Sequence, residues 1–272
     1  MDELWDIATV AAYLGVSERT VYNRVRAGEL PAIKLGRLWR VRPSDLDSWL
    51  RSACTAQPQS QPQTVASIPG PYPYASEREL IDVVGEIGAL PSRADLEALL
   101  APLSDPLARR LAFVGLLSRA CEELGWPAPV VVGGHAVEFY TAGDYPTADI
   151  DLAGASEPIA QVLTEWGFAH EGRHYFDGAL NLLLEVPGGR LAPEQLAHVV
   201  AVLLSGLTAY VLGIEDLIVD RLCACAHWSD HESCAWARVL LAGDYDVDRA
   251  YLLERARAED VLDKLAEIEG RS

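Results

Sequence analysis

A charge-free, proline-rich segment divides this chain in two. Between Arg51 and Glu77 there is no charged residue, and five prolines interrupt the run ACTAQPQSQPQTVASIPGPYPYAS. Proline prevents a helix from continuing, and the segment offers too few apolar side chains for a core. We therefore predict an N-terminal unit over residues 1–51, a linker over residues 52–76 and a larger domain over residues 77–272.

The two units differ strongly in charge. Residues 1–51 carry eight basic and seven acidic side chains, whereas the rest carries 14 basic and 33 acidic ones, giving net charges of +1 and −19. Because the acidic part would repel a duplex, a DNA-binding surface is expected only in the N-terminal unit.

Several features predict a cytoplasmic protein without a membrane partner. Five cysteines, an odd number with no C-x-x-C pair, favour a reducing compartment and argue against a disulfide framework. The acidic start MDELWDIATV lacks the apolar region of a secretory signal. The longest uncharged stretch, Leu196 to Ile214, is divided by Ser205-Gly206, so we interpret it as a buried helix followed by a buried strand.

The N-terminal unit has the pattern of a helix-turn-helix. An apolar face over Ile7–Leu14 ends at Gly15, and Ser17 can cap a second helix over Glu18–Ala27. Two short runs around Gly36-Arg37 then predict a hairpin with a basic tip, and Pro43 opens a last helix. Two short helices with polar groups at the start of the second have the geometry that enters a major groove.

The run from Ala11 to Val41 resembles the excisionase and MerR-like winged-helix family. The resemblance implies that the second helix reads bases and phosphates while the wing grips the DNA backbone. The implied DNA-binding residues are Ser17, Arg19, Thr20, Tyr22, Asn23 and Arg26 in the helix, and Lys34, Arg37 and Arg40 in the wing. The alternative is a small protein-binding domain with solvated arginines. Since one module contacts few base pairs and carries little net charge, we expect binding as a homodimer or as several copies on the DNA.

The larger domain alternates helices and strands. Helices are predicted from residue 77 to 124, then strands over Val130–Val132, Ala148–Leu152, Leu180–Val186 and Thr208–Leu212, with helices elsewhere. The fold class is therefore α+β: a winged helix-turn-helix, then an α/β core with a C-terminal helical bundle.

Acidic residues follow a glycine turn in this core. Gly133-Gly134 ends the first strand, and Asp149 and Asp151 lie two apart on the next, so their carboxylates share one face. Glu185, which ends a buried run, is the candidate for a third carboxylate. Hard oxygen donors at this spacing suit Mg²⁺. The other D-x-D pairs, at residues 45/47, 244/246 and 246/248, lack this apolar setting.

This arrangement resembles the nucleotidyltransferase superfamily, and is closest to minimal and toxin-type members related to abortive-infection systems. The resemblance runs from about Val130 to Ala258 and includes the pattern Thr-x-Asp-Ile-Asp-Leu from Thr147 to Leu152. It departs at Tyr145, where family members often have arginine. It implies transfer of a nucleotide from an NTP to an unknown acceptor. The implied metal-binding and catalytic residues are Asp149, Asp151 and Glu185, and the implied nucleotide-binding residues are Gly133, Gly134, Thr147 and Arg221.

Two functions remain open at this point. The first is a DNA-binding protein with a nucleotidyltransferase domain in a toxin–antitoxin or phage-defence system. The second is a non-catalytic transcription regulator whose larger domain senses a nucleotide or dimerises. Three other sites are set aside. Zinc at the cysteines and histidines of residues 223–234 is rejected because a continuous helix over them is too long to surround one ion, unless the chain folds back near Ser229-Asp230. Calcium at residues 244–248 is rejected, as is a hydrolase triad at His135 or His170, which have no obvious carboxylate partner.

Overall fold

The computed structural model describes most of the larger domain and parts of the N-terminal unit. The described residues are 4–14, 21, 24–25, 30–35, 38–46, 49, 65–66, 83–228 and 230–270. They pack around two apolar cores with no residue in common, one among residues 10–46 and one among residues 84–265. Apart from residues 65–66, the predicted linker lies outside the described residues.

The N-terminal unit combines a helix with a small hairpin. Helix α1 (Ile7–Leu14) begins after Asp6, whose carboxylate accepts a hydrogen bond of 2.8 Å from the backbone N–H of Thr9. Strands β1 (Ile33–Leu35) and β2 (Leu38–Arg40) pair antiparallel as the predicted wing. Val10 of the helix and Val41 after the wing are completely buried, so the apolar faces that the sequence predicts form one core.

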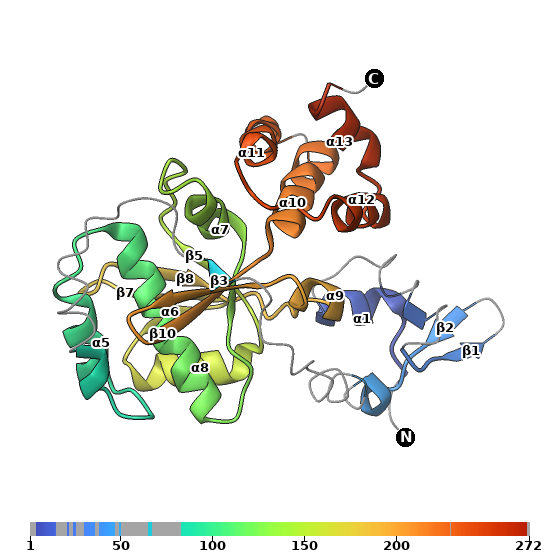
Figure 1. Cartoon of the computed structure of the whole chain (residues 1–272). Helices are drawn as coiled ribbons and strands as arrows, with labels where there is room; N and C mark the ends of the chain where they lie inside the picture. The colour runs from blue at the N-terminus through green and yellow to red at the C-terminus, as the bar shows by residue number, and fades with distance from the viewer. Residues whose placement is uncertain are drawn as a thin grey trace.

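A mixed sheet forms the centre of the larger domain (Figure 1). Its strand order is β3-β9-β10-β4-β5-β8-β7-β6. Strand β5 lies between β4, to which it is antiparallel, and β8, to which it is parallel. The edge strand β3 comes from the predicted linker, and the other seven lie between residues 130 and 211. The strands are β3 (Val65–Ala66), β4 (Val130–Val131), β5 (Ile150–Ala153), β6 (Ala169–Glu171), β7 (His174–Asp177), β8 (Leu182–Glu185), β9 (Val200–Leu204) and β10 (Leu207–Val211).

Helices cover this sheet and continue beyond it. Helix α6 packs along β10 with α8 beside it, while α7 packs against β5, α10 and α11. Figure 1 shows α10 to α13 gathered together at the C-terminal end of the chain. The larger domain is thus an α/β domain with C-terminal helices, as predicted. The helices are α5 (Arg93–Leu100), α6 (Pro106–Glu123), α7 (Gly133–Tyr140), α8 (Ser156–Glu165), α9 (Pro193–Leu196), α10 (Ile214–His227), α11 (His231–Ala242), α12 (Arg249–Ala258) and α13 (Leu262–Ile268).

The stretch from Leu196 to Ile214 differs from its prediction. Its first half forms β9 rather than a buried helix, and β9 pairs antiparallel with β10. Ser205 and Gly206 have φ angles of 48° and 92°, which suit a tight two-residue hairpin turn. The hairpin of β6 and β7 also lies where helix was predicted. None of the helices in the described part of the chain combines the length and apolarity that a bilayer span requires.

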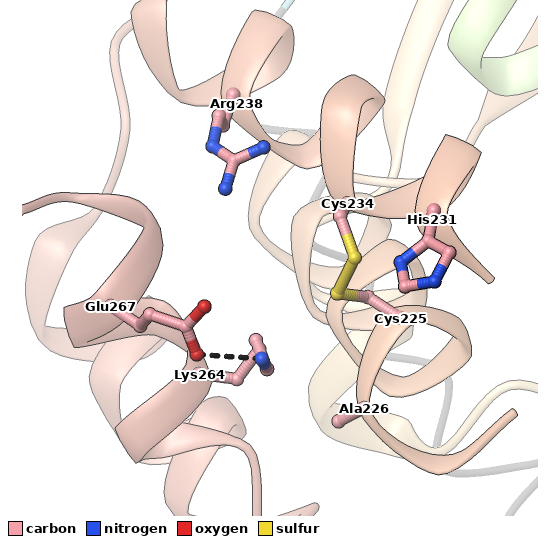
Figure 2. A pocket seen from close by; sticks show the side chains of 7 residues that line it. All are labelled: Cys225, Ala226, His231, Cys234, Arg238, Lys264 and Glu267. Atoms are coloured by element: carbon pink, nitrogen blue, oxygen red, sulfur yellow. Dashed lines mark hydrogen bonds and ion pairs between the residues drawn. A yellow bond between two sulfur atoms is a disulfide. The ribbon is translucent and has the colours of Figure 1, made fainter. Parts of the chain in front are cut away.

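The C-terminal helices contain a disulfide, contrary to the sequence expectation. Helices α10 and α11 fold back on each other, so Cys225 and Cys234 lie with their Cα atoms 5.0 Å apart and are bonded (Figure 2). Asp230 enables this reversal by capping α11: its carboxylate accepts hydrogen bonds from the N–H groups of Glu232 and Ser233. The expectation is wrong because an odd number of cysteines does not prevent one pair from meeting.

Candidate functional site

Three carboxylates converge where β5 and β8 run side by side. Asp149 immediately precedes β5, Asp151 is its second residue, and Glu185 ends β8. In the parallel register, Asp151 lies directly opposite Glu185. One oxygen from each of the three side chains lies within 4.8 Å of the others, and each residue is partly buried. The structure thus brings together all three acidic residues singled out in the sequence.

The Gly-Gly turn is shaped around one of these carboxylates. Gly133 has a φ of +56°, and a Cβ atom there would lie 2.2 Å from Oδ2 of Asp151. The backbone N–H of Gly134 donates a hydrogen bond of 2.9 Å to the same oxygen. The absence of a Cβ at Gly133 is therefore explained by the close approach of Asp151. Contact of either glycine with a phosphate stays a prediction.

The site concentrates negative charge. The pKa of Asp151 is raised to about 6, mainly by burial and also by the nearby Asp149 and Glu185, while the Gly134 N–H and Arg221 oppose this rise. Within the described residues, neither Asp149 nor Asp151 forms an ion pair, whereas Glu185 pairs with Arg173 at 2.8 Å. Two of the three carboxylates therefore form no ion pair within the described residues, although the charge of Arg221 acts on Asp151.

A divalent cation fits this arrangement. The donor atoms are all carboxylate oxygens, the hard ligands that Mg²⁺ prefers. They lie close enough to bind one ion, and an ion would neutralise the charge that raises the pKa of Asp151. Carboxylates that are partly buried and unpaired carry a desolvation cost, which a bound cation offsets.

Arg221 and Tyr145 lie next to the carboxylates. Arg221 is mostly buried on α10, where its Nη2 lies 2.6 Å from Oδ2 of Asp220, and its charge acts on both Tyr145 and Asp151. The Tyr145 ring packs edge-on against Trp236 of α11, with the ring centroids 4.9 Å apart. An aromatic pair thus occupies the position where the resemblance led us to expect an arginine.

Thr147 and His135 have partners that the sequence did not reveal. The Thr147 hydroxyl donates a hydrogen bond of 2.9 Å to Oδ1 of Asp149, so this residue contacts a carboxylate. His135 was expected to lack a carboxylate partner, but its Nδ1 lies 3.0 Å from Oε2 of Glu138. The expectation is wrong because α7 begins at Gly133, which places His135 inside the helix and Glu138 one turn later on the same face. Burial lowers the pKa of His135.

Two residues of the predicted DNA-binding surface are described. Lys34 is exposed on β1, and its Nζ lies 5.3 Å from the centre of the Trp39 ring. Arg40 is partly buried on β2 and donates a hydrogen bond of 2.9 Å from Nη1 to the backbone carbonyl of Trp39. The other predicted DNA-binding residues lie outside the described part of the chain: Ser17, Arg19, Thr20, Tyr22, Asn23, Arg26 and Arg37.

A separate hollow lies among the C-terminal helices, and none of the three carboxylates lines it. Its volume is about 470 Å³, and Figure 2 shows the disulfide on one side of it and an ion pair between Lys264 and Glu267, at 2.6 Å, on the other. The sulfur atoms of Cys225 and Cys234 are bonded to each other, so they do not offer two thiolates to zinc. At the rejected calcium site, Asp248 caps α12 through the N–H groups of residues 250 and 251.

Comparisons with known proteins concern the N-terminal unit. Residues 6–54 match the sequence model of a family described as "Helix-turn-helix domain". Over 51 residues the chain is 41% identical to each of two Mycobacterium tuberculosis proteins, "Putative DNA-binding protein MT0521" of strain CDC 1551 / Oshkosh and "Putative DNA-binding protein Rv0500A" of strain ATCC 25618 / H37Rv. Each match covers 19% of this chain and 65% of the relative, so the chain spans about two thirds of the length of these curated relatives.

No solved structure matches the chain significantly. The matched residues coincide with the unit built from α1 and the β1–β2 wing, and these matches do not extend into the α/β domain. The chain therefore carries an N-terminal helix-turn-helix domain, similar over this region to proteins named as DNA-binding, ahead of a mixed α/β domain.

Proposed function

We propose that the larger domain is a Mg²⁺-dependent nucleotidyltransferase and that the N-terminal unit binds DNA. The observation that carries the first part is the convergence of Asp149, Asp151 and Glu185 within 4.8 Å beside a glycine turn. The second part rests on the helix-turn-helix match over residues 6–54 and on the basic residues of that unit.

In this proposal the protein's own residues hold and orient the reactants. Asp149 and Asp151 bind the cation from one strand, and Glu185 binds it from the neighbouring strand. Mg²⁺ bound there would polarise the α-phosphoryl oxygen of an NTP and align the attacking group. Arg221, which lies near Asp151, binds the triphosphate through its guanidinium group. An acceptor nucleophile then bonds to the α-phosphorus, pyrophosphate leaves, and the acceptor's proton passes to solvent.

One observation favours the alternative of a non-catalytic regulator that senses a nucleotide or dimerises. Arg173 pairs with Glu185 and so neutralises one of the three carboxylates within the protein itself. In a catalytic site this pair would have to open or be shared with the cation. Arg173 is 60% exposed, and exposed ion pairs contribute little free energy, so a divalent cation can compete for Glu185.

Nucleotide transfer can be tested directly. The purified protein is incubated with each α-phosphate-labelled NTP, Mg²⁺, total RNA and protein extract, and labelled products are separated on gels. We expect Mg²⁺-dependent labelling that the Asp149→Asn variant loses. Asp246→Asn is the matched control, because Asp246 has the same D-x-D spacing but is exposed outside the site. If the wild-type protein binds a nucleotide but gives no labelled product, the result supports the regulator that senses a nucleotide. If it neither binds a nucleotide nor gives a labelled product, the result supports the regulator that dimerises.

DNA binding is tested separately with the full chain. Capture on fragments of its own promoter, followed by footprinting, should identify a protected sequence, and a symmetric pair of half-sites would support binding as a homodimer. Absence of sequence-selective protection at low salt would favour the protein-binding alternative for the N-terminal unit. This test is independent of the carboxylate site.

A further inference from the structure

Arg110 links three segments of the larger domain behind the carboxylate site. It projects from α6, and its side chain is only 14% exposed. Its Nη1 donates a hydrogen bond of 3.0 Å to the backbone carbonyl of Thr147, and its Nη2 pairs with Oε1 of Glu138 on α7. One largely buried guanidinium group thus connects α6, α7 and the segment that leads into β5.

The far end of this network is a buried histidine. The second carboxylate oxygen of Glu138 contacts Nδ1 of His135, whose side chain is completely buried. A carboxylate that is already paired with an arginine accepts a hydrogen bond, so the proton of the imidazole lies on Nδ1. Glu138 therefore has partners on both oxygens and is held in one orientation against Arg110.

The near end of the network is a metal-binding candidate. The carbonyl group of Thr147 is held by Arg110, while its hydroxyl donates to Oδ1 of Asp149 at 2.9 Å. This hydrogen bond occupies one oxygen of the carboxylate and fixes its side-chain torsion. The other oxygen of Asp149 would then be available to a cation.

We propose that Thr147 and Arg110 are positioning residues that hold Asp149 ready for the divalent cation. The proposal rests on the metal site of the proposed function. It assigns Thr147 a role toward Asp149 rather than toward a nucleotide. Groups that orient the ligands of a metal govern its affinity in general. A buried Arg–Glu pair adds little net stability over apolar residues, so its value here lies in the orientation that it imposes.

The first test removes only the hydrogen bond to Asp149. Mn²⁺ replaces Mg²⁺ as the probe, and its binding is titrated by electron paramagnetic resonance. Thr147→Val should weaken Mn²⁺ binding by about 10-fold or more, and Thr147→Ser, which keeps the hydroxyl, should restore the affinity to within about threefold of wild type. A purely structural role of Thr147 would lower stability in chelator but leave the Mn²⁺ affinity unchanged.

The second test removes the hydrogen bond that Arg110 donates to the backbone carbonyl of Thr147. Arg110→Met alone would leave Glu138 charged and buried, so the variant is Arg110→Met combined with Glu138→Gln, which leaves no unpaired charge and keeps an acceptor for His135. We expect a folded protein whose Mn²⁺ affinity falls about 10-fold. Arg109→Met is the matched control and should leave the affinity unchanged, because the hydrogen bonds of Arg109 within the described part of the chain go to the backbone carbonyls of residues 100 and 180.

The outcomes separate the two proposals. If the wild-type protein does not bind Mn²⁺, both the metal site and the positioning role are overturned. If the wild-type protein binds Mn²⁺ but the Thr147→Val variant and the Arg110→Met/Glu138→Gln variant bind it equally well, only the positioning role is overturned. Weakened binding in both variants with rescue by Thr147→Ser supports the positioning role, whatever the reaction catalysed.

Discussion

Replacing Asp151 with asparagine should stabilise the metal-free protein, although most substitutions of partly buried residues destabilise. The pKa of Asp151 is raised from 3.8 to about 6, with burial as the main cause and Asp149 and Glu185 as further ones. Ionising this carboxylate at neutral pH therefore costs folding free energy. Asparagine removes the charge and still offers an oxygen to the Gly134 N–H.

The magnitude follows from the shift. One pKa unit corresponds to 1.36 kcal/mol, so a rise of about two units costs the folded state on the order of 2–3 kcal/mol. The native state holds the proton more tightly than the unfolded state, so the free energy of unfolding falls as pH rises from about 4 to 6. At pH 7 Asp151→Asn should recover this free energy and raise Tm by roughly 5–10 °C for a domain of this size. At pH 4 wild type and variant should unfold alike.

The assay is thermal and urea unfolding of wild type, Asp151→Asn and the exposed control Asp246→Asn, each in chelator and in Mg²⁺ or Mn²⁺. A cation at a hundredfold excess over its Kd should stabilise the wild type by about 2.7 kcal/mol and the variant far less. Two results would refute the reasoning: a lower stability of Asp151→Asn in chelator at pH 7, or a stabilisation that is the same at pH 4 and pH 7.

Three further predictions concern other features of the molecule. Gly133→Ala should abolish detectable Mn²⁺ binding and lower stability, because the new methyl group would collide with the carboxylate of Asp151. The control Gly125→Ala, at a φ of +79° with open space around it, should lower stability without changing Mn²⁺ binding; Mn²⁺ titration and urea unfolding measure the two effects. Cys234→Ser should lower the free energy of unfolding by roughly 2–3 kcal/mol, as expected for opening a loop of about ten residues, and wild type in reductant should match the variant. Lys34→Gln should reduce the salt dependence of DNA binding by about one unit in the log–log slope, as for loss of one phosphate contact, and Lys264→Gln should not change it; binding isotherms at several salt concentrations measure this.

The sequence predicts the part of the carboxylate site that depends on residues close together in the chain. Asp149 and Asp151 share a face because a strand alternates its side chains, and this period needs no knowledge of the rest of the fold. Glu185 was found from the apolar run that it ends. Its placement opposite Asp151 is non-local, because the register of β5 and β8 depends on how the whole sheet pairs.

The network behind the site was beyond the sequence. Arginine side chains are commonly solvated in folded proteins, and only the packing of α6 against the rest of the domain turns Arg110 toward Glu138. Strand β9 was missed for a different reason: its five apolar residues have neither the helical nor the alternating period. The turn at Ser205-Gly206 between two apolar runs was the available hairpin signal. The disulfide between Cys225 and Cys234 could be predicted only with the knowledge that the chain reverses between α10 and α11.

Because β5 and β8 pair in a fixed parallel register, the number of residues that precede Glu185 in β8 determines whether its carboxylate reaches Asp149 and Asp151. Inserting one residue before Glu185 would turn its side chain to the opposite face of the sheet, whereas inserting two would restore the face but move the carboxylate roughly 6–7 Å along the strand. The turn before β8 is anchored by Asp177, which pairs with Arg93 of α5 and accepts a hydrogen bond from the Leu180 N–H. We therefore expect changes in length to be tolerated on the far side of this anchor. The eight residues from 178 to 185 instead have a length that is set by the pairing of β8 with β5.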